Sequence, residues 1–139
     1  MTKDEQREAK RASVLDEKKH VSSKISDLSR YIGFGLVAIV YTILTSDSKL
    51  VIRIYEEYTI LLLVVAGFGA LTIILDYLQF LSGYHAVEKA LTNEEGDYRY
   101  NDRSCWYRLR VVTFWLKQGT AFFGAIFLFV VIALSAFIL

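Results

Sequence analysis

The chain has 139 residues, enough for one small domain, and it is 54% hydrophobic yet 22% charged. Its charged and apolar residues lie in separate blocks, which excludes a soluble core, where the two classes alternate at the helical or strand period. The net charge of +1 favours no class of partner. The sequence contains no proline, so nothing interrupts a helix, and its continuous apolar runs are not the alternating strands of a membrane barrel. We therefore predict an all-α membrane protein.

Six segments follow one another along the chain, distinguished by charge and hydropathy. Three of them are apolar and close to the roughly 20 residues that a helix needs to cross a bilayer. In order, the segments are a cytosolic N-terminal helix at 1–28, a first transmembrane helix at 29–46, an external link at 47–58, a second transmembrane helix at 59–81, a cytosolic link at 82–117 and a third transmembrane helix at 118–139.

The orientation follows from the distribution of lysine and arginine. Of the 16 basic residues, eight lie within residues 1–30, two in the first link and six in the second. Basic segments are retained on the cytosolic side of a membrane. The N-terminus and the second link are therefore predicted to be cytosolic, and the first link and the C-terminus external.

The end of the second link is amphipathic. Over Trp106 to Leu116, apolar and aromatic residues alternate with Arg108 and Arg110, a composition typical of the membrane interface. We expect a short helix that lies on the inner leaflet and then turns into the third transmembrane helix.

A row of residues spaced by seven connects the N-terminal helix to the first transmembrane helix. Sevenfold spacing of apolar residues is the seam of a coiled coil. Outside the membrane the seam is apolar, which predicts an oligomer interface at Val14, Val21, Ile25 and Leu28. Within the membrane the same side becomes small or polar, which predicts pore-lining positions at Gly35, Ala38, Thr42 and Thr45. The alternative is that this side of the helix packs on the other two spans of the same chain.

Asp76 is the only acidic residue within a predicted span. A charge inside a bilayer costs about 2.5–3.5 kcal/mol on insertion scales, so such residues usually serve a function. In a symmetric oligomer Asp76 would form an acidic ring that favours cations. The alternative is a salt bridge with Lys117 or Arg110, which we expect at the same membrane depth.

The second and third spans contain clusters of small residues. Ala66 and Ala70, like Ala121 and Ala125, are separated by three residues, a spacing that lets helices approach closely in lipid. We expect most of this pattern to serve packing within the subunit.

The cytosolic link contains arginines beside aromatic residues. Such pairs bind nucleotides or single-stranded nucleic acid by charge and stacking. This predicts a site for a cytosolic ligand or partner at Tyr98, Arg99, Tyr100 and Arg103. The alternative is a solvated turn with local ion pairs.

The sequence has no motif of an enzyme. It contains no phosphate loop, nucleophile elbow or HExxH sequence, and His20 and His85 are far apart. We therefore predict no catalytic residues, no metal site and no cofactor.

The stretches KISDLSRYIGFGLVAIV and LDYLQFLSGYHAVEKAL, with the YR pairs that follow, lie in an arrangement of short spans and charged cytosolic segments. In this layout the chain resembles the SLATT-type membrane effectors of bacterial anti-phage systems, and it differs from their usual two-span plan by the third span. The resemblance implies a homo-oligomeric pore in the bacterial inner membrane. It also implies a separate cytosolic sensor, such as the nucleotidyltransferase of Hailong-type systems, and thus a nucleotide or oligonucleotide signal.

Two other functions fit the same segments. The chain is then either a non-conducting accessory or scaffold subunit of a larger membrane complex, or a holin-like protein that forms lesions without a trigger. A closed ring of identical chains distinguishes the channel from the accessory subunit.

Overall fold

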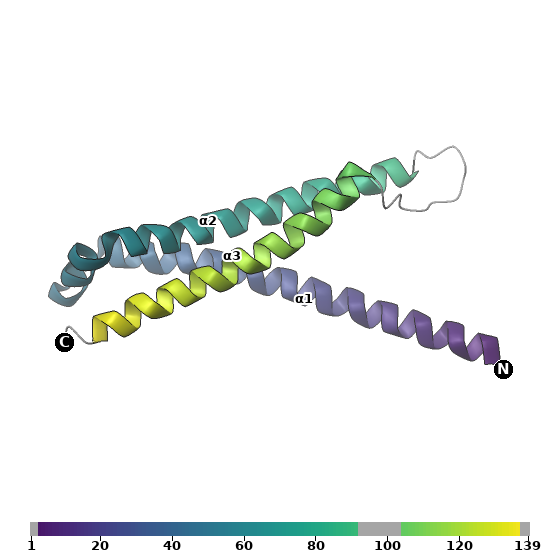
Figure 1. Ribbon diagram of the computed structural model, residues 1–139, viewed down its shortest axis with the longest axis horizontal. Helices are drawn as coiled ribbons and strands as arrows, with labels where there is room; N and C mark the ends of the chain where they lie inside the picture. The colour runs from purple at the N-terminus through teal and green to yellow at the C-terminus, as the bar shows by residue number, and fades with distance from the viewer. Residues whose placement is uncertain (1–2, 92–103, 137–139) are drawn as a thin grey trace.

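The computed structural model describes residues 3–91 and 104–136, which form three long helices and contain no strand. Helix α1 spans Lys3–Thr45, α2 spans Lys49–Leu91 and α3 spans Cys105–Ala136 (Figure 1). The end of α2, the start of α3 and the N-terminal end of α1 lie at one end of the molecule, and the α1–α2 turn lies at the other. The chain thus runs up, down and up again, as three membrane crossings require.

All three helices are long and apolar enough to cross a membrane. Helices α1 and α2 have 43 residues each and α3 has 32. At about 1.5 Å per residue, α1 is about 65 Å long, roughly twice the hydrocarbon thickness of a bilayer. Large apolar side chains cover the outside of the three helices, with Ile60 78% and Phe129 71% exposed. Lipid is the solvent that such a surface fits, as expected of a multi-pass membrane protein.

The helices run further than the sequence segments suggested. Most of the predicted link at 47–58 is helical, but a kink at Tyr58, with φ −118° and ψ 22°, separates this short helical piece from the rest of α2, where we predicted the second span to begin. Our expectation of a separate interfacial helix over Trp106 to Leu116 is wrong, because Cys105–Ala136 is one continuous helix. No proline lies there to break the hydrogen-bond ladder, and Lys117, where we expected the turn, is fully buried among the helices.

One side of α1 packs on α2 and α3. It is a stripe of small and apolar residues at alternating intervals of three and four, and all of them are buried: Ser26, Ser29, Gly33, Leu36 and Val40. At 3.6 residues per turn, such spacing keeps a single side of a helix against its neighbours. Beyond this stripe the N-terminal half of α1 diverges from α2 and α3 (Figure 1).

Helices α1 and α2 touch at two glycines. A Cβ atom on Gly69 would lie 2.8 Å from the carbonyl oxygen of Gly33 and 3.0 Å from Cγ2 of Val37. The backbones are therefore too close for any larger residue, which is how small residues drive helix association in lipid. Between this contact and the α1–α2 turn, an apolar core joins all three helices. It consists of Leu36, Val40, Leu62, Val65 and Val131.

Replacing Gly69 by alanine will destabilise the subunit. The added methyl group meets backbone and packed side chains that cannot move independently, and overpacking of this kind costs about 1–3 kcal/mol. The measurement is the midpoint of thermal unfolding in detergent. Gly67→Ala is the matched control, because a Cβ on Gly67 meets nothing within 4 Å. Equal midpoints for the two variants would show that the glycine contact does not set the helix spacing.

Candidate functional site

An ion cluster joins the three helices near the end of the bundle that holds the N-terminal end of α1. Nζ of Lys117 on α3 donates to Oδ1 of Asp76 on α2 at 2.5 Å and to Oγ of Ser26 on α1 at 2.6 Å. Nε of Arg30 on α1 donates to Oδ2 of Asp76 at 2.6 Å. Each carboxylate oxygen thus accepts from one cation. We call Ser26, Arg30, Asp76 and Lys117 the three-helix ion cluster.

The cluster is buried and close to electrically neutral. Lys117 is 0% exposed, and the side chain of Asp76 is 8% exposed. The side chain of Arg30 is about one-third exposed; it lies 3.7 Å from a carboxylate oxygen of Asp27 and stacks over the ring of Phe80. Two cations and two carboxylates therefore face one another. An isolated charge in this environment is costly, whereas a paired and hydrogen-bonded set is tolerated.

Hydroxyl groups on either side of the cluster satisfy their own hydrogen bonds. Thr72 and Thr120 share a 2.9 Å hydrogen bond between α2 and α3, and Thr72 also donates to the carbonyl oxygen of Phe68. Thr113 donates to the carbonyl oxygen of Leu109 one turn before it. Of these, the Thr72–Thr120 hydrogen bond joins two helices and adds a polar contact between α2 and α3 beside the cluster.

Asp76 fits the salt-bridge interpretation of the sequence. The pairing with Lys117 is present, while the second cation is Arg30 and not Arg110, which instead lies against Gly83. A single subunit does not present this carboxylate on its surface. An acidic ring in an oligomer stays a prediction.

The residues predicted for the oligomer seam are all exposed in the subunit. They are Val14, Val21, Ile25 and Leu28, of which Leu28 is 60% exposed. The predicted pore-lining residues continue this side: Ala38, Thr42 and Thr45 are exposed, and a Cβ on Gly35 would meet nothing within 4 Å. The row drifts around α1 from the seam positions to the pore-lining positions, as sevenfold spacing does on a helix of 3.6 residues per turn, and it packs on neither α2 nor α3 within the described residues.

The alternative interpretation of this row is wrong within the described part of the chain. We considered that it packs on the other two spans, but α1 uses the Ser26–Val40 stripe for that contact. At 3.6 residues per turn, the seam positions lie on average about 90° around the helix from this stripe, and the pore-lining positions about 180° from it. The same helix therefore has one side for its own subunit and a second side that remains free.

The predicted ligand residues of the cytosolic link, Tyr98, Arg99, Tyr100 and Arg103, lie outside the described residues. Within the same link, the rings of His85 and Trp106 lie 4.6 Å apart between centroids, and this contact joins α2 to the start of α3. In residues 3–91 and 104–136, no three His, Cys, Asp or Glu side chains are grouped so that they could hold a metal ion.

Sequence reasoning missed Arg30 and Ser26 as partners of the cluster. Ser26 was assigned to the cytosolic helix at 1–28, and Arg30 to the start of the first transmembrane helix at 29–46 without a partner. The signal that identifies Ser26 is its place at the head of the Ser26–Val40 stripe, which is as regular as the seam on the other side. No comparable pattern marks Arg30.

Comparison with known proteins gives no relative, since neither a protein-family model, nor a curated protein, nor a solved structure matches the chain.

Proposed function

We propose that the chain is the subunit of a homo-oligomeric pore or ion channel in the bacterial inner membrane, with copies meeting along the exposed row of α1. The observation that supports it is the continuity of that row, from the apolar positions before the first span to the small and polar positions within it. Coiled-coil spacing favours identical copies as the occupant of this surface.

The N-terminal half of α1 needs a partner of its own. It diverges from the other two helices (Figure 1), and Val14, Leu15 and Val21 are exposed along it. An isolated helix in water is only marginally stable, and exposed valine and leucine make it poorly soluble. A parallel bundle of α1 helices removes both problems and places the first spans around a common axis.

Within such a bundle, the membrane part of the row lines the axis. Thr42 and Thr45 donate to the carbonyl oxygens of Ala38 and Tyr41 in their own helix, at 2.8 and 2.9 Å. Their hydroxyl oxygens can still accept hydrogen bonds from water in a narrow path. Gly35 and Ala38 leave room near the axis because their side chains are small. The three-helix ion cluster then holds each subunit rigid behind the pore wall.

The orientation and the role follow from the basic segments and from the resemblance. The N-terminus and the link at 82–117 face the cytosol, and the C-terminus is external. The pore acts as effector of an anti-phage defence system and is gated by a cytosolic partner, such as a nucleotidyltransferase, or by its nucleotide signal. The N-terminal half of α1 receives that signal, and its rigid continuation into the first span transmits it.

Disulfide cross-linking tests the contact between copies. In a Cys105→Ser background, Leu28→Cys will cross-link subunits into covalent dimers, because seam positions of neighbouring copies meet. Leu15→Cys is the matched control: it is about equally exposed on the same helix, but it lies about 140° around the helix from Leu28. Denaturing electrophoresis after mild oxidation gives the result. Equal yields from both positions would contradict a contact along the α1 row.

Ion flux distinguishes the pore from the accessory subunit. The purified protein in liposomes, alone or with its cytosolic activator, will release an entrapped fluorescent ion indicator, and images of the particle will show a closed ring. A particle with a single copy of the chain and no flux would favour the non-conducting accessory subunit.

A further inference from the structure

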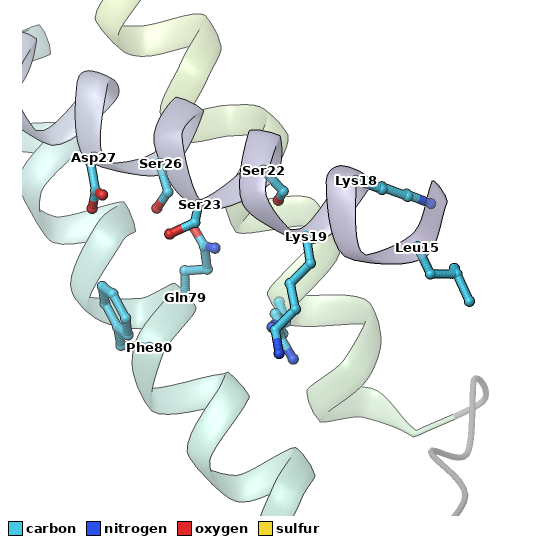
Figure 2. Close-up of a pocket in the computed structure, with 10 residues that line it drawn as sticks. Leu15, Lys18, Lys19, Ser22, Ser23, Ser26, Asp27, Gln79 and Phe80 are labelled. Carbon is cyan, nitrogen blue, oxygen red and sulfur yellow. The ribbon is translucent and has the colours of Figure 1, made fainter. Parts of the chain in front are cut away.

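A cleft of about 450 Å³ opens where α1 diverges from α2 and α3. Its polar lining comes from all three helices: Lys18, Lys19, Ser22 and Ser23 on α1, Gln79 on α2 and Arg110 on α3. Lys19 extends from α1 toward the other helices, and the amide of Gln79 faces Ser23 (Figure 2). The volume is within the range of small-molecule sites, about 300–1,000 Å³.

The charge of the cleft is positive. Lys18, Lys19 and Arg110 contribute three cations, and Asp27 is the only carboxylate in the lining. Asp27 in turn lies 3.7 Å from a guanidinium nitrogen of Arg30, so its charge is already partly compensated. The cations have no comparable counterpart in the lining. The cleft is therefore complementary to an anion.

The remaining polar groups indicate what kind of anion. The hydroxyl groups of Ser22 and Ser23 can donate hydrogen bonds to oxygens of a tetrahedral anion. Oε1 of Gln79 is buried and has no hydrogen-bond partner among the described residues, so it can accept from a hydroxyl group. A phosphate ester with a neighbouring hydroxyl group supplies both partners, and arginine with lysine is the usual cationic pair for phosphate.

The depth of the cleft matches the headgroup layer. The lining residues on α1 precede the predicted first span, which begins at 29, and those on α2 lie at the end of the second span, which ends at 81. On α3, Arg110 precedes the third span, which begins at 118. Basic pockets between transmembrane helices at this level bind lipid headgroups. The same position is accessible to soluble phosphate esters from the aqueous side.

We propose that this cleft binds a phosphate group, presented by an anionic phospholipid headgroup or by a soluble phosphate ester. The site belongs to one subunit and does not depend on pore formation. A phosphate that joins Lys19 on α1 to Arg110 on α3 fixes the angle at which the N-terminal half of α1 leaves the bundle.

The test removes two cations and compares the effect with an equal loss of charge elsewhere. The variant is Lys19→Gln/Arg110→Gln, and the control is Lys24→Gln/Lys49→Gln, whose lysines are exposed and do not line the cleft. Native mass spectrometry measures phosphatidylglycerol and phosphatidylcholine retained by the detergent-solubilised protein. Calorimetric titration with glycerol 3-phosphate, without lipid, tests the soluble source.

We expect the wild type and the control to retain phosphatidylglycerol in preference to phosphatidylcholine, or to bind glycerol 3-phosphate. The cleft variant will bind the same probe more weakly by about tenfold or more, since each basic residue near a membrane surface contributes about fivefold. Binding of the lipid alone identifies a headgroup, and binding of glycerol 3-phosphate identifies a soluble ester. Lys18→Gln/Lys19→Gln, on the exposed part of α1, serves if Arg110→Gln fails to fold.

The proposal is overturned if the wild type binds neither phosphatidylglycerol nor glycerol 3-phosphate. It is also overturned if the cleft variant, folded by circular dichroism, binds as tightly as the control. Neither result bears on ion flux through the oligomer, so failure of the phosphate site and failure of the pore are separate outcomes.

Discussion

Replacing Asp76 by asparagine will destabilise the subunit by about 3–5 kcal/mol, the cost of breaking a buried ion pair by removing one partner. The carboxylate is the counter-charge of both Lys117 and Arg30, and Lys117 is fully buried. In the variant the Lys117 ammonium keeps only the hydroxyl of Ser26 among its observed partners. Chemical or thermal unfolding in detergent, followed by circular dichroism, measures the loss.

Two further variants test the origin of this loss. Asp16→Asn removes an exposed carboxylate from α1 and will leave the unfolding midpoint unchanged. Asp76→Asn/Lys117→Met removes the unpaired ammonium as well and will recover part of the stability, because no fully buried charge is then left without a counter-charge. A fully stable Asp76→Asn protein with altered cation preference would contradict the structural role and favour an acidic ring in the pore.

Replacing Gly35 by leucine will abolish ion flux without unfolding the subunit. A Cβ at this position would meet nothing within 4 Å in the single chain, so we expect the subunit to tolerate the larger residue. In the proposed oligomer the same residue lies at the contact between copies or on the pore axis, where only small residues allow close approach. The measurements are liposome flux and the unfolding midpoint of the same preparation.

The control for this variant is Gly67→Leu, because Gly67 on α2 is equally open in the subunit. We expect Gly67→Leu to insert, fold and conduct, since α2 is not on the proposed axis. Unchanged flux in Gly35→Leu would remove the first span from the pore lining. Loss of flux in both variants would show that the defect is not specific to the α1 row.

The phosphate cleft and the α1 row both include residues of the N-terminal half of α1, so a ligand in the cleft can affect gating. The N-terminal half of α1 diverges from the other two helices (Figure 1), and Val14 and Val21 are exposed along it. A ligand between Lys19 and Arg110 and a second copy along Val21 and Leu28 both act on the angle at which this half leaves the bundle. Binding at one surface is therefore expected to change affinity at the other, as linkage requires.

The three membrane-crossing helices were predictable from the sequence alone. A long apolar run without proline forms a helix in lipid whatever its neighbours are, so each helix can be identified from its own segment of the sequence. The pairing of Asp76 with Lys117 was one of the two interpretations that the sequence allowed for this residue. A carboxylate within a membrane span requires a cation at the same depth. Small-residue packing was also expected, but Ala70 and Ala125 are exposed and only Ala121 of the four named alanines is buried. The tight approach in α3 is at Gly124, where a Cβ would lie 2.5 Å from Cδ1 of Leu36.

Only the tertiary structure decided which side of α1 faces its own subunit. Two rows on this helix have sevenfold regularity, one through Gly33 and Val40 and one through Leu28 and Gly35, and both mix small with apolar residues. The choice depends on the close approach of Gly33 to Gly69, a contact between residues far apart in the chain. The pairing of Arg30 with Asp76 and the continuity of α3 through Lys117 were likewise visible only in the tertiary structure. Both depend on the relative depth and rotation of three helices, which the sequence of a single segment does not determine.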